Sequence, residues 1–132
     1  MNPETRLQHE VMLALSEAGC VIWRNNTGQA WLGKPIHQAG DQVTLQGAHK
    51  IPFGLCVGSA DLIGIAPGGR FLAVEVKVPA SAARRAGRVS PEQRDFLAAI
   101  NAAGGIGGIA RSVDDALMLV DAARSMDGPH NT

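Results

Sequence analysis

The chain has 132 residues, and its 12 basic and 12 acidic side chains give a formal net charge of zero at pH 7. This length suits one domain that buries roughly 70% of its unfolded surface, and a hydrophobic content of 45% excludes a disordered chain. The polar N-terminal segment predicts no signal peptide, and no apolar run approaches the length of a membrane span. Two widely separated cysteines predict neither a disulfide framework nor a zinc site, and they fit a reducing cytoplasm.

The first predicted helix begins after Asn2, a capping residue that is followed by proline and an acid. Leu7, Val11 and Leu15 recur at helical spacing and form one apolar stripe, in which Glu4 also falls. An acid on an inward stripe needs a partner, whereas an acid that only complements the helix dipole needs none. Periodicity alone leaves both interpretations of Glu4 open.

A short strand is expected at residues 20–24, and residues 29–53 have the least regular pattern. Short apolar runs separated by Gly and Pro predict small strands that would form a hairpin arm. Lys34 and Lys50 would point outward on this arm, toward DNA or a second subunit. A solvated loop is equally consistent with the sequence.

Residues 58–77 hold two apolar runs separated by a Pro-Gly-Gly turn, which predict a β-hairpin. A three-residue turn brings Asp61 opposite Glu75, whereas a two-residue turn shifts the register by one. The period of a strand places Glu75 and Lys77 on one face. Paired carboxylates repel each other, and a hard cation such as Mg²⁺ takes carboxylate oxygens and water. The non-catalytic alternative is an exposed face on which Glu75 and Lys77 form an ion pair, while Asp61 caps a loop.

The segment after this hairpin is basic. Between residues 70 and 94, six basic side chains stand against two acidic ones, which allows a phosphate-binding face on a chain of zero net charge. An Ala-rich stretch with Arg84 and Arg85 predicts a mobile loop. A capping box at Ser90 then begins a helix. Gln93 in its first turn either bonds back to the backbone at Ser90 or holds a metal-bound water or a phosphate.

A strand at residues 106–111 and a helix through about residue 123 complete the predicted elements. The glycines at 104–108 lack the spacing of a nucleotide-binding loop and predict a helix end that runs into a strand. The element order predicts a single α/β domain over residues 1–124, with a mixed β-sheet flanked by helices and a flexible tail at 125–132.

These motifs, in this order, resemble the VRR-NUC family of the PD-(D/E)XK nuclease superfamily. The resemblance covers most of the chain and is weakest over residues 29–53. It is carried by Asp61, by Glu75-Val76-Lys77, by Gly87-Arg88-Val89-Ser90-Pro91-Glu92-Gln93, by Gly104-Gly105, and by Ala110-Arg111-Ser112-Val113-Asp114-Asp115. The residue before Asp61 is Ala60, not the proline of the superfamily's name.

The resemblance implies a restriction-endonuclease-like core that hydrolyses DNA phosphodiesters with Mg²⁺ or Mn²⁺. The implied metal ligands are Asp61, Glu75, the backbone carbonyl of Val76, and Glu4 from the first helix. Lys77 and Gln93 would act beside the metal, and the expected DNA contacts are Arg84, Arg85, Arg88, Lys34 and Lys50. A homodimer acting on branched DNA such as four-way junctions is expected. A flap or single-strand nuclease and a non-catalytic DNA-binding module remain alternatives.

Overall fold

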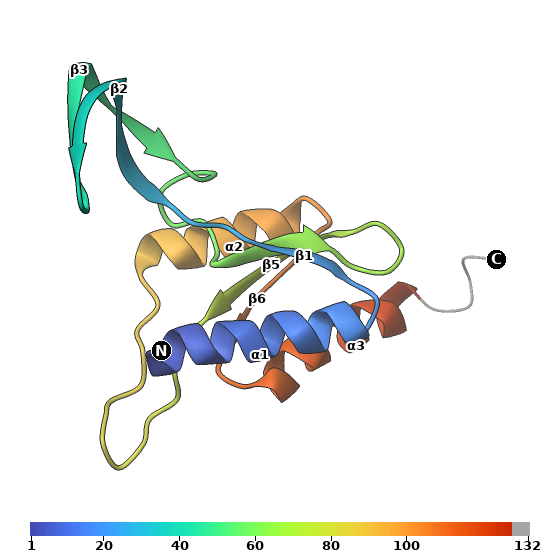
Figure 1. The fold of residues 1–132 in the computed structure, drawn as a ribbon. Helices are drawn as coiled ribbons and strands as arrows, with labels where there is room; N and C mark the ends of the chain where they lie inside the picture. Colours follow the sequence, from blue (N-terminus) through green and yellow to red (C-terminus); the bar gives the residue numbers. More distant parts are fainter. Residues whose placement is uncertain (128–132) are drawn as a thin grey trace.

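The structure, a computed structural model, describes residues 1–127 and shows a core of helices and sheet from which a two-stranded ribbon projects (Figure 1). The helices are α1 (Pro3–Glu17), α2 (Pro91–Ala102) and α3 (Val113–Asp127). The strands are β1 (Val21–Arg24), β2 (Gly28–Ala39), β3 (Gln42–Phe53), β4 (Leu62–Ile65), β5 (Phe71–Val76) and β6 (Ile106–Ala110).

The central sheet has four strands in the order β1-β4-β5-β6. Neighbouring strands are antiparallel from β1 to β5, and β6 is parallel to β5. Helices α1 and α3 pack together on one face of this sheet, and α2 covers the other face (Figure 1). The predicted mixed sheet with helices on both faces is therefore confirmed.

Alternation along β5 decides which side chains enter each half of the core. Leu72, Val74 and Val76 belong to the larger cluster, under α1 and α3. Ala73 belongs to the smaller cluster, under α2, where it packs with Leu97. Because successive strand residues point to opposite faces, Glu75 must lie on the α2 side.

Helix ends follow the predicted capping. Asn2 caps α1, with its side chain accepting a hydrogen bond from the Thr5 N–H at 2.8 Å. Helix α3 extends beyond the predicted end near residue 123, so residues 125–127, which were expected in a flexible tail, are helical. The last turn is held because Ala123 is buried and Arg124 donates to the carbonyl of Ala18 at 3.0 Å. The rest of the expected tail, residues 128–132, lies outside the described residues.

The arm expected over residues 29–53 consists of two 12-residue antiparallel strands, β2 and β3, which are longer than the small strands predicted. The pairing shifts between Leu32 and Lys34 and again between Pro35 and His37. Because these irregularities interrupt the strict alternation of side chains, the sequence pattern underestimates the length of both strands. Nearly all arm residues are exposed.

Gly64 in β4 permits the close approach of β1. It is buried, and a Cβ added there would overlap the carbonyl oxygen of Val21. Gly64→Ala is therefore expected to lower the free energy of unfolding by at least about 2 kcal/mol, measured by urea denaturation. Gly40→Asn is the control, because that exposed turn has open space around it and Asn tolerates its positive φ of 60°. Equal stability of the two variants would contradict the close-packing argument.

Candidate active site

Asp61 and Glu75 lie opposite each other at one end of the β4–β5 hairpin. The Ala66 N–H donates to the Arg70 carbonyl at 2.9 Å, which closes a three-residue turn over residues 67–69. The paired residues run from Ile65–Phe71 to Leu62–Val74, and one further step brings Asp61 opposite Glu75. The three-residue register is confirmed, and the two-residue alternative is excluded.

Asp61 is held by backbone contacts on both sides. One oxygen of its side chain, Oδ2, accepts a hydrogen bond from the Val76 N–H at 3.0 Å. Its carbonyl accepts from the Asn25 N–H at 2.8 Å. The Asn25 side chain donates to Ser59 Oγ at 2.7 Å and to the Ala60 carbonyl at 2.9 Å. Asn25, at the end of β1, thus anchors the loop that carries Asp61.

Glu75 is a buried carboxyl group, with only 1% of its side chain exposed. Its Oε1 accepts a hydrogen bond from Gln93 Nε2 at 3.0 Å and lies 3.6 Å from Lys77 Nζ. Its Oε2 forms no hydrogen bond within residues 1–127. Burial, followed by the neighbouring Asp61 carboxylate, raises the pKa of Glu75 to about 8, although the Lys77 ammonium opposes this shift. Without a cation, the group therefore holds a proton at neutral pH.

Gln93 forms the cap, which is one of the two roles considered for it, and it also donates to Glu75, whereas its contact with a metal-bound water or a phosphate stays a prediction. Its Oε1 accepts from the Ser90 N–H at 2.9 Å, while Ser90 Oγ accepts from the Gln93 N–H at 3.1 Å. The capping box is therefore complete. Because the box fixes the amide group by its oxygen, the NH₂ group of Gln93 is directed at Glu75. The cap at the start of α2 and the buried carboxyl group of β5 thus share one side chain.

Glu4 is partly buried in the first turn of α1, on the opposite face of the sheet from α2. No group of three or more His, Cys, Asp and Glu side chains that could hold a metal ion occurs in the described part of the chain. The structure therefore does not bring Glu4 into one such group with Asp61 and Glu75, and its role as a ligand stays a prediction.

Gln8, one helical turn after Glu4, is a site residue that the sequence analysis missed. It is 8% exposed and its Oε1 accepts from Arg24 Nη2 at 3.2 Å. It shares with Asp61 a polar cavity of about 260 Å³ at the base of the arm. A polar residue at the edge of the apolar stripe was the available signal.

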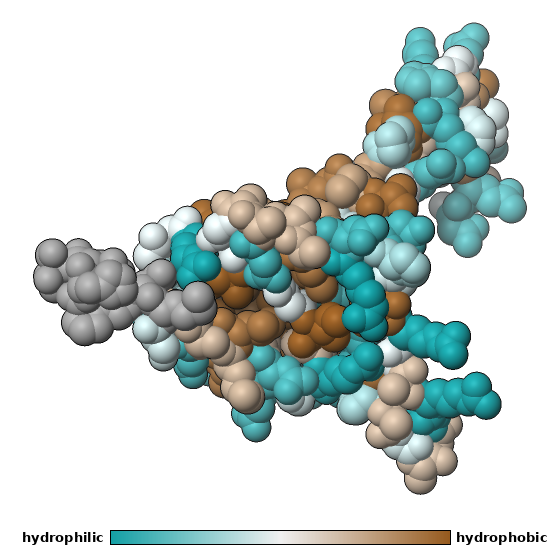
Figure 2. All heavy atoms as spheres, turned by 180° about the vertical axis from the view of Figure 1, so that it is seen from behind, coloured by the Kyte–Doolittle hydropathy of each residue, from teal (hydrophilic) through white to brown (hydrophobic). Residues whose placement is uncertain are grey.

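The basic residues flank this site on two projections that leave the same end of the molecule (Figure 1). Seen from behind, hydrophilic side chains gather at that end (Figure 2). One projection is the arm, on which Lys34 is exposed and Lys50 Nζ lies 5.4 Å from the centre of the Trp31 ring. The other is the segment at residues 78–87, whose exposed side chains include Arg84 and Arg85.

This second projection, predicted as a loop, is a short hairpin. The Gly87 N–H donates to the Val78 carbonyl at 2.9 Å, and Ser81 pairs with Arg84. Arg111, beyond the end of β6, donates from Nη1 to the carbonyls of Val78 and Gly87 at 3.2 and 2.8 Å. Arg111 therefore ties both ends of the hairpin to the sheet. Arg88, which follows the hairpin, is also exposed.

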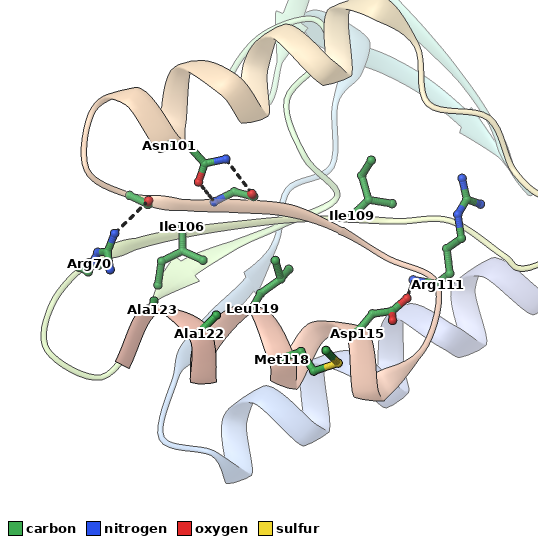
Figure 3. A pocket seen from close by; sticks show the side chains of 12 residues that line it. Arg70, Asn101, Ile106, Ile109, Arg111, Asp115, Met118, Leu119, Ala122 and Ala123 are labelled. Carbon is green, nitrogen blue, oxygen red and sulfur yellow. Dashed lines mark hydrogen bonds between the residues drawn. The ribbon is translucent and has the colours of Figure 1, made fainter. Parts of the chain in front are cut away.

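Another cavity, of about 560 Å³, lies elsewhere, along the outer edge of β6 between α2 and α3 (Figure 3). Its wall is mostly apolar and includes Ile109, Met118 and Leu119. The Asn101 side chain accepts a hydrogen bond from the Gly107 N–H at 2.8 Å and donates one to the Gly107 carbonyl at 2.9 Å. It therefore occupies backbone groups through which another strand would pair. Neither carboxylate of the pair lines this cavity.

No helix within residues 1–127 is long and apolar enough to cross a membrane. The two cysteines are free thiols.

A pair of carboxylates at the end of a sheet, the second of them buried and followed two residues later by a lysine, is the arrangement of the PD-(D/E)XK nuclease superfamily. The VRR-NUC domain matches residues 2–114, and the chain belongs to the VRR-NUC family. It therefore has a nuclease-type function in DNA processing. Comparison with curated proteins and with solved structures gives no match.

Proposed function

We propose that this protein is a metal-dependent DNA endonuclease whose cation, Mg²⁺ or Mn²⁺, binds Asp61 and Glu75. The backbone carbonyl of Val76 would be a further ligand, and Glu4 would bind a second ion or its water shell. The observation that carries this proposal is the Glu75 carboxyl group, which is buried beside a second acid with one oxygen lacking a hydrogen-bond partner within residues 1–127.

The residues present fit a hard divalent cation. Such cations take carboxylate and carbonyl oxygens and retain water, and the pair offers the oxygens of a buried Glu75 and of Asp61, which lines the polar cavity at the base of the arm. Burial and the neighbouring Asp61 raise the pKa of Glu75 despite the nearby Lys77 ammonium, which supports the need for a further positive charge at the pair. A cation between the two acids would provide that charge and displace the proton.

When bound, the cation would supply an activated water molecule and neutralise charge on the phosphate. Lys77, whose side chain is 14% exposed and whose Nζ lies 3.6 Å from Glu75 Oε1, would donate to the phosphate oxygen on which negative charge develops. Gln93 would hold the Glu75 carboxylate in one orientation, since its own amide is fixed by the cap. These contacts support the roles that we propose for Lys77 and Gln93 in phosphodiester hydrolysis.

We further propose that the substrate is branched DNA such as a four-way junction and that the enzyme acts as a homodimer in the cytoplasm. Support comes from the two projections beside the site: Lys34 and Lys50 on one, and Arg84 and Arg85 on the other, with Arg88 beside it. Contacts from such side chains to phosphates position a duplex without reading its bases. Two sites related by a twofold axis would suit the symmetry of a junction.

The test is cleavage of labelled four-way junction, flap, duplex and single-stranded DNA with Mg²⁺ or Mn²⁺, by wild type and by Lys77→Ala. Faster cleavage of the junction, lost in the variant, is expected. Equal rates on all four substrates would reject junction preference. A wild type that binds DNA but cleaves none of them would favour the non-catalytic module. Light scattering in solution tests the dimer.

Gln93→Ala and Ser90→Ala separate the two roles of the cap. Each is expected to lower the free energy of unfolding by about 1 kcal/mol, because each removes half of the capping box. Only Gln93→Ala also removes the donor to Glu75, so it is expected to reduce cleavage about tenfold or more relative to Ser90→Ala. Thermal unfolding and initial cleavage rates measure both effects. Equal cleavage by the two variants would show that the contact with Glu75 has no part in the reaction.

A further inference from the structure

A second basic feature lies beside Lys77, at the junction of three segments. A cavity of about 510 Å³ is lined by Ala86, Gly87, Arg88, Val89, Arg94 and Arg111. No acidic side chain lines it. Gly87 forms a wall that this cavity shares with Lys77, because a Cβ at Gly87 would lie 3.4 Å from the Cβ and Cδ atoms of Lys77.

No acidic side chain within the described residues forms an ion pair with Arg88, Arg94 or Arg111. Arg111 donates to two neutral carbonyls, and its backbone N–H, not its side chain, is bound by Asp115 at 2.9 Å. Within residues 1–127, the side chains of Arg88 and Arg94 make neither a hydrogen bond nor an ion pair. Arg94 follows Gln93 in the first turn of α2, so its backbone is as firmly placed as the cap.

Three arginines that line one cavity carry like charges that repel each other, and an anion bound among them would reduce that repulsion. A guanidinium group matches phosphate oxygens with two parallel N–H donors, which makes arginine the usual residue for phosphate recognition. The shared wall at Gly87 places this space next to the lysine that would act on the scissile phosphate. A DNA strand bound with its scissile phosphate at Lys77 would have a neighbouring phosphate within reach of this cavity.

We propose that Arg88, Arg94 and Arg111 form a phosphate-binding subsite that holds a phosphodiester of the cleaved strand next to the scissile one. The inference rests on the proposed nuclease function. It gives Arg94 and Arg111 roles in binding and separates Arg88 from Arg84 and Arg85, which extend from the hairpin. Arg111 also ties the hairpin to the sheet, so Arg94 provides the cleaner test.

The first experiment measures binding of a labelled four-way junction in EDTA by fluorescence anisotropy over a series of NaCl concentrations. Arg94→Gln is expected to raise Kd about tenfold at low salt and to lower the slope of log Kd against log salt by about 1. Arg94→Lys keeps the positive charge but lacks the two parallel N–H donors of a guanidinium group. Its Kd should therefore lie between those of the wild type and Arg94→Gln. Arg6→Gln is the matched control, because it removes the same charge from an exposed side chain that lies outside this cavity.

The second experiment follows the arginine Nε resonances of the wild type by NMR during titration with inorganic phosphate. Shifts confined to Arg88, Arg94 and Arg111 are expected. If the wild type cleaves DNA but Arg94→Gln binds it no more weakly than Arg6→Gln, the subsite is wrong while the nuclease function stands. If these resonances respond to phosphate but the wild type cleaves nothing, the nuclease function fails and the anion site stands. Phosphate shifts spread over all arginines would also overturn the subsite.

Discussion

Glu75→Ala is expected to reduce DNA cleavage by more than about 100-fold and to abolish the tight binding of Mn²⁺. The substitution removes one of two converging carboxylates, and it leaves Asp61 with an incomplete set of oxygens for a hard cation. Cleavage of labelled DNA and isothermal titration with Mn²⁺ measure the two effects. Since both depend on one group, they should be lost together.

Glu17→Ala is the control for this substitution. Glu17 is an exposed acid at the end of α1, so its loss changes the net charge equally without touching the site. Cleavage by Glu17→Ala should remain close to that of the wild type. Full cleavage by Glu75→Ala, or wild-type cleavage that survives EDTA, would contradict the metal-dependent mechanism.

The second large effect concerns the free energy of unfolding of the metal-free protein. Because the pKa of Glu75 is raised from 4.5 to about 8, the folded state binds more protons than the unfolded state between these two values. The stability of the metal-free protein therefore falls as the pH rises from 4.5 through 8. Glu75→Gln carries no titrating group at this position, so its stability does not fall over this pH range for this reason. The variant should gain up to about 5 kcal/mol over wild type above pH 8 and little at pH 4.5.

Urea denaturation in EDTA at pH 4.5, 7 and 9 measures this difference, with Glu17→Gln as a control that should follow the wild type. Adding Mn²⁺ at pH 9 is expected to restore the stability of wild type but not of Glu75→Gln, because only the ionised pair takes up the cation. A difference between wild type and Glu75→Gln that stays constant from pH 4.5 to 9 would disprove the raised pKa.

Much of the site's frame could be predicted from local patterns. The Pro-Gly-Gly turn has only two plausible lengths, and the longer one, with the Ala66–Arg70 closure, places Asp61 opposite Glu75. Capping by Asn2 and Ser90 was also predictable, because a cap depends on residues within one helical turn. Such features rest on contacts a few residues apart.

Other parts could not be predicted, because they depend on contacts between distant segments. Asn25 anchors residues that lie 34 and 35 positions away, and Arg111 ties a hairpin 24 positions or more before it. Neither residue belongs to a periodic pattern that would mark it. Gln8 was visible only as a polar residue at the edge of a stripe. Its hydrogen-bond partner Arg24 is 16 positions away in the sequence, so only the folded chain shows that the two side chains meet.

The amino-acid sequence by itself determined Asp61, Glu75 and Lys77 as candidate site residues and the family to which the chain belongs. The alternation of a strand places Glu75 and Lys77 on one face, whereas the pairing of Asp61 with Glu75 depended on a turn length that the sequence left open. Only the tertiary structure decided that α2 buries Glu75, that the capping amide of Gln93 donates to it, and that Arg94 and Arg111 share a cavity beside Lys77. Burial and the meeting of like charges result from packing between elements. Local periodicity carries no information about either.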